Sequence, residues 1–358
     1  MIINVSKPYL PPLPEYYKYL EGIWDRTCLT NNGPLVTELE KRLEEYLEVK
    51  HVQVVTSGTV ALQIAISALG LQGEIITTAF SHVSTTNSAL LGNLKPVFID
   101  IEEKSFCIDP GKIEEAVTSR TSAILATHVY GHPCDVKKIQ AIADKYKLKV
   151  IYDGAHAFGV KAYNQSIFNY GDITTTSFHA TKLYHTIEGG AIMTKDEKTA
   201  QKCMMLKNFG IKDAIPQIAG INGKHSEFHA AMGLCNLPQV NNFINKQSEL
   251  SLLYRFLLRD LPLTFPDLSR DIRYNYAYFP VVFSLKEEMM RVKGELESEG
   301  IFARRYFYPS LNKLSYYKRY DCPVAEEISE KIMCLPLYYE LSFDDVRRIA
   351  AVIINSYD

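Results

Sequence analysis

The stretch Val54-Val55-Thr56-Ser57-Gly58-Thr59-Val60-Ala61 decides the fold, because an apolar strand turns into a helical pattern within a few residues. Ser57 and Thr59 offer hydroxyl groups, and Gly58 lets another group approach the backbone closely. Free amides at the start of a helix attract an anion, so this turn has the shape of a phosphate-binding site. Alone, Ser-Gly-Thr is also an ordinary helix cap.

The alternation of strand and helix continues through the first two-thirds of the chain. Segments that read as strands occur at Val52–Val55, Glu74–Thr78, Pro96–Asp100, Ser122–Thr127, Lys149–Tyr152, Ile173–Ser177 and Gly190–Thr194. Helical patterns lie between some of them, at 83–91 and 136–146. This βαβ rhythm predicts an α/β fold with a mainly parallel, seven-stranded sheet.

The last third of the chain has a different pattern. A long helical stretch begins at Glu227 and runs to about Leu261, and Pro238 is expected to kink or divide it. Segments 277–283 and 301–306 then read as strands, and 286–299 and 343–357 read as helices. We predict two closely packed domains, a large α/β domain at 1–244 and a smaller α+β domain at 245–358.

Two further motifs supply an acid and an amine. The buried strand Val150-Ile151-Tyr152-Asp153 ends in a carboxylate, and Ser177-Phe178-His179-Ala180-Thr181-Lys182 ends in a lysine. A lysine can form a Schiff base with an aldehyde cofactor, and an aspartate can keep a pyridinium nitrogen protonated. Ligands of open α/β sheets bind outside the carboxyl ends of the strands. Together with the phosphate turn, these motifs predict a site for pyridoxal 5′-phosphate (PLP).

With these motifs the chain resembles the DegT/DnrJ/EryC1/StrS family of PLP-dependent nucleotide-sugar aminotransferases. Each motif is weak alone, but their order along nearly the whole chain is specific. The segments that carry the resemblance are 29–34, 56–59, 127–131, Asp153, 177–190, 222–228 and 334–337. The resemblance implies the aspartate-aminotransferase-like fold, also called fold type I.

The resemblance also implies roles for individual residues. Lys182 would bond covalently to PLP, and Asp153 would pair with the ring nitrogen. Asn222 matches an asparagine that reaches the phosphate from the neighbouring subunit, which implies a homodimer with shared active sites. Other phosphate contacts would come from the turn and from the strand before the lysine: Ser57, Gly58, Thr59 and Ser177.

Two positions depart from the commonest pattern of the family. His156 stands where many relatives have glutamine, and its imidazole can still donate a hydrogen bond to the ring oxygen of PLP. His82 stands where relatives usually stack an aromatic ring on the cofactor. An imidazole stacks less extensively, so His82 is either a cofactor contact or a histidine of a surface loop.

The sequences of segments 153–158 and 177–190 are similar to those of family members that aminate dTDP-linked keto-6-deoxyhexoses. The resemblance therefore implies L-glutamate as amino donor and a 4-keto sugar as acceptor, in the synthesis of surface polysaccharide such as lipopolysaccharide O-antigen. A 3-keto sugar is the alternative. A PLP-binding protein with only a regulatory role is a further alternative, which the presence of Lys182 and Asp153 disfavours.

Composition excludes several other classes of protein. The 358 residues are 47% hydrophobic with a formal net charge of −2, so no basic excess points to nucleic acid. No apolar stretch is long enough for a membrane helix, and the amino terminus lacks a secretory pattern, so we expect a cytoplasmic protein without a membrane partner. The seven cysteines form no Cys-x-x-Cys pair, which predicts reduced packing residues.

Three other groups of residues have plain alternatives. His128, His132, Cys134 and Asp135 have metal-ligand chemistry, but Gly131 and Pro133 oppose a regular helix, so we expect no metal there. The resemblance implies instead that this segment is a structural loop near the cofactor. The tyrosines of the last third either pack in the core or contact a nucleotide sugar. Arg304 and Arg305 either bind a diphosphate or lie solvated at the surface.

Overall fold

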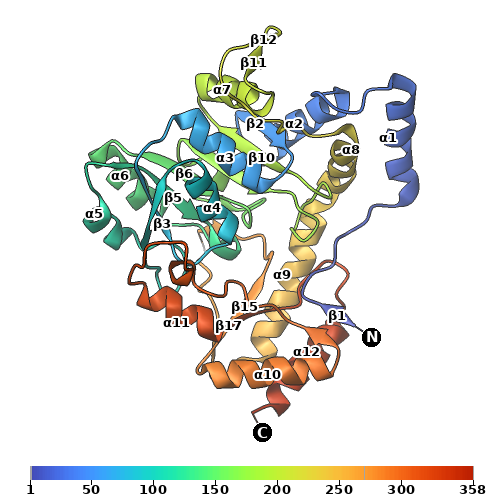
Figure 1. Ribbon diagram of the computed structural model, residues 1–358. Coiled ribbons are helices and arrows are strands. Elements are labelled where there is room, and N and C mark those ends of the chain that lie inside the picture. Colours follow the sequence, from blue (N-terminus) through green and yellow to red (C-terminus); the bar gives the residue numbers. More distant parts are fainter. Residues whose placement is uncertain (1, 270, 358) are drawn as a thin grey trace.

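The computed structural model, which describes residues 2–269 and 271–357, is built around one seven-stranded sheet (Figure 1). The strand order is β2-β10-β9-β6-β5-β3-β4. Their bounds are β2 His51–Val55, β3 Glu74–Thr78, β4 Lys95–Ile99, β5 Thr121–Thr127, β6 Lys149–Asp153, β9 Ile173–Ser177 and β10 Gly190–Thr194. β10 is antiparallel to both of its neighbours, and the other pairs are parallel. The predicted mainly parallel α/β sheet is confirmed.

Both faces of the sheet are covered, which explains why most residues of its strands are buried. Successive residues point to opposite faces, so Val54 belongs to one buried cluster and Val55 to another. Val150 and Ile151 likewise belong to different buried clusters, one on each face of the sheet. The helices that come before the carboxy-terminal part of the chain are α1 Leu13–Arg26, α2 Pro34–Leu47, α3 Gly58–Leu69, α4 Val83–Leu91, α5 Ile113–Ala116, α6 Val136–Tyr146, α7 Glu197–Lys207 and α8 Glu227–Asn236.

The carboxy-terminal part forms a second layer at the bottom of Figure 1. Pro238 lies in the short 3₁₀ helix η4 (Leu237–Gln239), which divides α8 from α9 (Val240–Leu257) as predicted. A small antiparallel sheet follows, in the order β13-β15-β17. The remaining elements of this part are β13 Leu263–Thr264, β15 Phe279–Phe283, α10 Lys286–Ser298, β16 Ile301–Phe302, α11 Pro323–Lys331, β17 Ile332–Leu335 and α12 Phe343–Asn355.

The predicted strand at 301–306 is wrong beyond its first two residues. β16 ends at Phe302, because its ladder partner β1 is itself only Ile3–Asn4. Arg304 then makes a single bridge to Cys334, and the chain continues without regular structure. This irregular segment lines the pocket described below.

Two buried clusters bear on the division into domains. The carboxy-terminal cluster includes Leu250, Phe279 and Ile353, and it also takes in Ile3 from the amino terminus. α9 runs without interruption across 244/245. The division at that position stays a prediction, with the amino-terminal strand packed on the carboxy-terminal part.

The remaining elements are short. The hairpin of β11 (Ile211–Lys212) and β12 (Ile215–Pro216) projects at the top of Figure 1, and α1 stands apart from the sheet. The other short pieces are β7 Lys161–Ala162, β8 Gln165–Ser166, β14 Ile272–Arg273, η1 Pro110–Lys112, η2 Val129–Gly131, η3 Ile167–Asn169 and η5 Leu311–Lys313. Within the described ranges, no helix combines the length and the apolar character needed to span a bilayer.

Candidate active site

One pocket collects the predicted motifs at the ends of the strands. It measures about 1030 Å³, counting the space at its open mouth. Of the nine predicted cofactor residues, those that line it are Ser57, Gly58, Thr59, His82, Asp153, His156, Ser177 and Lys182. The sequence motifs, which are up to 125 residues apart along the chain (57 to 182), therefore meet at one site.

The turn before α3 forms the end of the pocket suited to an anion. Ser57 is the N-cap of α3, and its Oγ accepts a hydrogen bond from the amide of Val60 at 3.2 Å. A Cβ at Gly58 would lie only 2.9 Å from the Cβ of Ser177, so glycine is needed for the turn to approach β9. The first amides of a helix have no partner within it. The turn thus presents amides and hydroxyls to a phosphate group.

Asp153 lies at the bottom of the pocket with its carboxylate held by two donors. The residue is 4% exposed. Its Oδ2 accepts from Thr85 Oγ1 at 2.7 Å, and its Oδ1 accepts from the amide of Ala155 at 3.0 Å. Ser81 Oγ lies 2.8 Å from Thr85 Oγ1 and extends this polar chain. The oriented carboxylate has lone pairs left for a protonated ring nitrogen.

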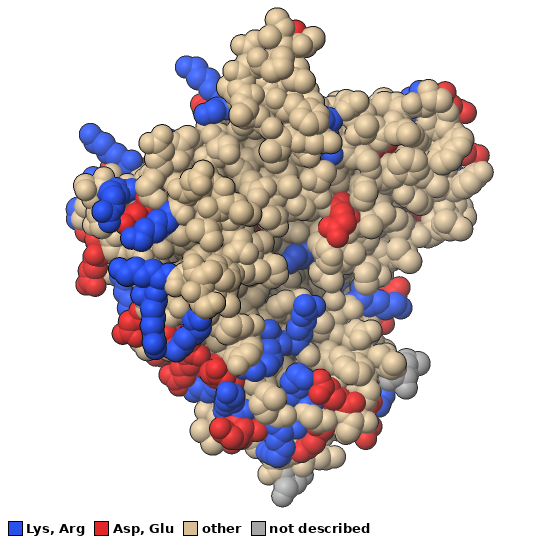
Figure 2. All heavy atoms as spheres, in the orientation of Figure 1, with Lys and Arg blue, Asp and Glu red and all other residues tan. Residues whose placement is uncertain are grey.

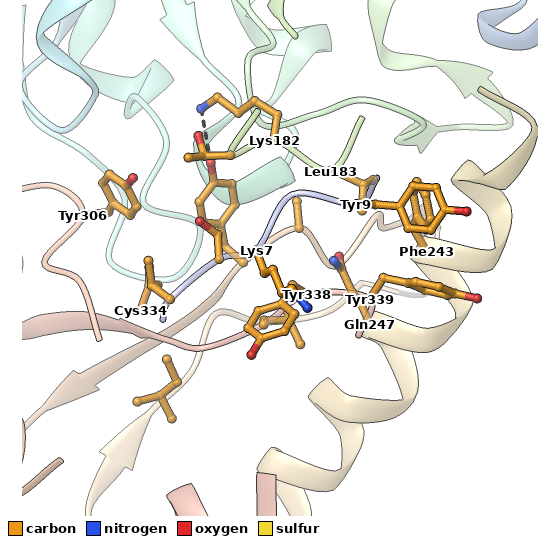
Figure 3. Close-up of a pocket in the computed structure, with 17 residues that line it drawn as sticks. Lys7, Tyr9, Lys182, Leu183, Phe243, Gln247, Tyr306, Cys334, Tyr338 and Tyr339 are labelled. Carbon is orange, nitrogen blue, oxygen red and sulfur yellow. Dashed lines mark hydrogen bonds between the residues drawn. The ribbon is translucent and has the colours of Figure 1, made fainter. Parts of the chain in front are cut away.

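Lys182 reaches the pocket from the loop after β9. Its Nζ donates a hydrogen bond to Tyr278 Oη at 3.2 Å, the dashed line in Figure 3. Burial lowers the pKa of Lys182, although Tyr306 and Asp153 act in the opposite direction. A lowered pKa increases the fraction of neutral amine, which is the form that acts as nucleophile or base.

His156 has a defined hydrogen-bonding state. Its Nδ1 accepts the amide hydrogen of Tyr130 at 3.1 Å, so the ring proton of the neutral imidazole resides on Nε2. Burial holds the pKa of His156 well below its ordinary value, which keeps the ring neutral. The ring stacks on Phe307, with centroids 5.6 Å apart and an angle of 8°. Nε2 is therefore a hydrogen-bond donor, as the predicted contact with the cofactor oxygen requires.

His82 combines features of both predictions made for it. It caps α4, where its Nδ1 accepts from the amide of Ser84 at 3.2 Å. It is exposed, yet it also lines the pocket. Its ring makes an edge contact with Phe307, and the two ring centroids are 6.5 Å apart. Whether its ring stacks on the cofactor stays a prediction.

Asn222 is the predicted site residue that does not line this pocket. It is exposed, and Lys224 Nζ donates to its Oδ1 at 2.8 Å. Its segment nevertheless packs beside the phosphate turn, since the amide of Thr56 bonds to the carbonyl of Gly223 at 3.1 Å. That placement leaves the Asn222 amide facing outward near the site.

The two candidate arginines have different surroundings. Arg304 is exposed and lines the pocket mouth, and it has no carboxylate within 4 Å among the described residues. Arg305 instead donates to the carbonyls of Ser329 and Glu330. Arg304 is thus the one of the pair that could meet a substrate anion.

The tyrosines in the last third of the chain also fall into two groups. Tyr278 and Tyr306 both line space that also borders Lys182, as Figure 3 shows for Tyr306. Tyr317 donates to Asn87 Oδ1 at 2.7 Å, and Tyr274 Oη accepts from the amide of Ser269 at 3.0 Å. The packing interpretation therefore holds for some of these tyrosines and not for all of them.

The side chains of the His128 loop are engaged in local structure. His128 Nδ1 accepts from the amide of Cys134 at 3.1 Å, and Cys134 Sγ donates to the carbonyl of Thr127 at 3.2 Å. Asp135 caps α6 by accepting from the amide of Lys138. These contacts hold the loop in place beside Asp153, whose carbonyl accepts from the amide of His128 at 3.0 Å.

Sequence reasoning gave Thr85 no role and did not place Tyr278 at the lysine, although Thr85 contacts Asp153 and Tyr278 contacts Lys182. Thr85 lies in the first turn of α4 and Tyr278 lies just before β15. A threonine in a helix and one tyrosine among 23 carry no local signal. Only the fold brings them to Asp153 and Lys182.

Comparison with known proteins identifies the family. The model of the DegT/DnrJ/EryC1/StrS aminotransferase family matches residues 14–354. The dTDP-4-amino-4,6-dideoxy-D-glucose transaminase of Shigella dysenteriae is 43% identical over 359 residues, which cover 98% of each chain.

Two solved structures share the fold. DesI, solved in the presence of its TDP-sugar product, has a TM-score of 0.95 at 31% identity, covering 99% of this chain and 93% of DesI. NtdA of Bacillus subtilis, with its cofactor PMP bound, has a TM-score of 0.90 at 29% identity, covering 96% and 81%. The phosphate turn, the buried carboxylate of Asp153 and the amine of Lys182 fit the same cofactor. The chain belongs to the DegT/DnrJ/EryC1/StrS family and is a PLP-dependent nucleotide-sugar aminotransferase.

Proposed function

We propose that this enzyme transfers the amino group of L-glutamate to carbon 4 of a dTDP-linked 4-keto-6-deoxyhexose, giving dTDP-4-amino-4,6-dideoxyglucose. The observation that carries the proposal is the meeting of Lys182, Asp153 and the α3 turn in one pocket with Arg304 at its mouth. The choice of sugar is supported by the name of the relative that is 43% identical over nearly the whole chain.

The bound PLP supplies an aldehyde that takes up the amino group and a ring that withdraws electrons. Lys182 Nζ, as a neutral amine, would accept the proton from the α-carbon of the donor and deliver it to the carbon that was the aldehyde of the cofactor. The same amine reverses these transfers when the keto sugar has replaced the donor. Tyr278 Oη accepts a hydrogen bond from Nζ and keeps the freed amine beside the reacting atoms.

Asp153 and the phosphate turn position the cofactor in this proposal. Asp153, fixed by Thr85 and Ala155, holds a proton at the ring nitrogen. The amides of Gly58 and Thr59 would bind the phosphate, together with hydroxyls from Ser57, Thr59 and Ser177, all of which line the pocket. His156 Nε2 donates to the ring oxygen.

We further propose a homodimer in which Asn222 completes the site of the partner subunit. The exposed apolar side chains Phe209, Ile215 and Ile221 lie close to Asn222 in sequence and are 49%, 60% and 41% exposed. Figure 2 shows that charged side chains gather over α10 to α12, while the area over α3 and the β11–β12 hairpin is mostly uncharged. A large uncharged area suits a subunit interface.

Mixing two inactive variants tests the shared site. K182A and N222A homodimers should both be impaired, since each site lacks one contribution. In a mixed dimer, one site would have both intact residues, so mixing after subunit exchange should restore activity. An N222A homodimer with full activity and full PLP affinity would refute the role of Asn222.

Purified enzyme should be incubated with glutamate and either the 4-keto or the 3-keto dTDP sugar, and the aminated carbon should be assigned by NMR. Amination at carbon 4 is expected. A product aminated at carbon 3 would refute the proposed substrate. We place this reaction in the cytoplasm, in the supply of amino sugar to surface polysaccharide such as O-antigen.

A further inference from the structure

A second chamber adjoins Lys182 on the side of the carboxy-terminal domain. It measures about 600 Å³, counting space open to solvent. It shares Thr181, Lys182 and Tyr306 with the cofactor pocket, so both spaces open onto the same lysine. Figure 3 shows Lys182 at one end of the chamber and Lys7, Gln247 and Tyr338 at the other.

The lining of this chamber is rich in hydrogen-bond donors and has no acid. Its 17 residues include two lysines and no aspartate or glutamate. Burial raises the pKa of the phenols of Tyr9, Tyr306 and Tyr338, so these hydroxyls stay neutral and able to donate. Such a lining favours a group that only accepts hydrogen bonds and carries negative charge.

Gln247 provides the most specific feature of the chamber. It projects from α9, is 5% exposed, and its Oε1 has no hydrogen-bond partner among the described residues. A buried amide without a partner is unfavourable, and native proteins rarely keep one unless a ligand or water completes it. Rotation of the amide by 180° exchanges oxygen and nitrogen, so Gln247 can present its NH₂ group to a carboxylate.

Lys7 adds a positive charge at the far end. Its ammonium pairs with Glu340, which does not line the chamber. An ammonium has three hydrogens, so this pair leaves others to donate. The pair also ties the amino-terminal segment to the loop after β17, which places Lys7 beside the chamber.

We propose that this space is a donor chamber, which binds the side-chain carboxylate of the amino donor through the Gln247 amide, with Lys7 supplying further attraction. The inference rests on the proposed function, in which L-glutamate is the donor. The α-carbon of the donor lies near Lys182 during proton transfer, and its side chain extends from there toward Gln247. The keto sugar, which must follow the donor at the same lysine, extends instead through the mouth beside Arg304.

Measuring the two half-reactions separately distinguishes binding of the amino donor from binding of the keto sugar. In the first, PLP-loaded dimer is mixed with L-glutamate, and the rate of loss of the visible absorption band is followed against glutamate concentration. In the second, enzyme loaded with pyridoxamine phosphate is mixed with the keto sugar. Q247L removes the amide at nearly constant size, and Q247N keeps an amide on a shorter side chain. N245L, on the exposed face of α9, is the matched control.

Q247L should raise the apparent Kd for glutamate on the order of 10- to 100-fold, as expected for loss of a hydrogen bond to a charged group. The limiting rate and the keto-sugar half-reaction should stay close to wild type, which also shows that the variant folds. Q247N should give a smaller rise, and N245L none.

Two results would overturn the inference. Unchanged glutamate affinity in both Gln247 variants would leave only water in the chamber. A weakened keto-sugar step with normal glutamate binding would assign it to the sugar. Failure of wild-type enzyme to form 2-oxoglutarate would instead refute glutamate as donor in the proposed function, before any variant is compared.

Discussion

Replacing Thr85 by valine tests whether the orientation of Asp153 matters for catalysis. The change keeps the size of the side chain but removes the hydroxyl that donates to Asp153 Oδ2 at 2.7 Å. Both residues are buried, so water cannot readily replace the donor. A hydrogen bond to a charged group contributes about 1.5–3 kcal/mol. If all of this is felt in the reaction, turnover falls roughly 10- to 150-fold. We expect the lower end, because the Ala155 amide still holds Oδ1.

The assay is release of 2-oxoglutarate from glutamate, with PLP loading measured on the same samples. Thr85→Ser keeps a hydroxyl and should restore most of the rate. Thr86→Val is the matched control, since it also removes a buried hydroxyl of α4. That hydroxyl donates to the carbonyl of Val83 at 3.3 Å and accepts from Tyr317 Oη at 2.9 Å, but it does not bond to Asp153. Wild-type turnover in the T85V variant, with full cofactor loading, would refute the positioning role.

Two further predictions concern stability and cofactor affinity. Hydrogen bonds from Thr118 and Arg120 lower the pKa of Glu74 to about 2 from its ordinary 4.5. A carboxyl whose pKa falls on folding stabilises the fold above its unfolded pKa, so this contribution is lost as the pH falls from 4.5 toward 2. Unfolding by urea should therefore show a steeper loss over this range in wild type than in E74Q. G58A should weaken PLP binding roughly 5- to 150-fold in a fluorescence titration, because the new Cβ meets Ser177 and overpacking of this kind typically costs about 1–3 kcal/mol.

For each of these two variants, one result would contradict the prediction. Gly294→Ala is the control for G58A, since a Cβ there meets no atom within 4 Å. Equal PLP affinity of G58A and wild type would show that the turn does not need its close approach to β9. Parallel stability curves for E74Q and wild type between pH 4.5 and 2 would contradict the lowered pKa of Glu74.

The parts of the fold that sequence predicted are those fixed by local patterns. Val52–Val55 and Lys149–Tyr152 are mostly apolar because both faces of the central sheet are covered, and such segments are recognisable without the structure. Pro238 breaks the long helical stretch for an equally local reason. The motif residues could be placed together because the carboxyl ends of parallel strands share one edge of a sheet.

The remaining features depend on contacts between distant segments. Ile301–Tyr306 has the composition of a strand, but the length of β16 is set by β1, about 300 residues away in the sequence. Gln247 reads as one polar position of a helix, and its burial depends on the folded chain, in which Phe243 of α9 contacts Tyr9 of the amino-terminal segment. Asn222 does not line the pocket of its own chain, so the role proposed for it depends on the proposed dimer.

The most direct test of the central claim is the visible absorption spectrum of PLP-loaded enzyme before and after addition of L-glutamate. The account predicts a band from PLP bound to Lys182 that disappears with glutamate, together with formation of an equal amount of 2-oxoglutarate. K182A, loaded in the same way, should not show this lysine-bound band. A band that glutamate leaves unchanged would contradict the proposed amino transfer, and an identical band in K182A would contradict the assignment of Lys182.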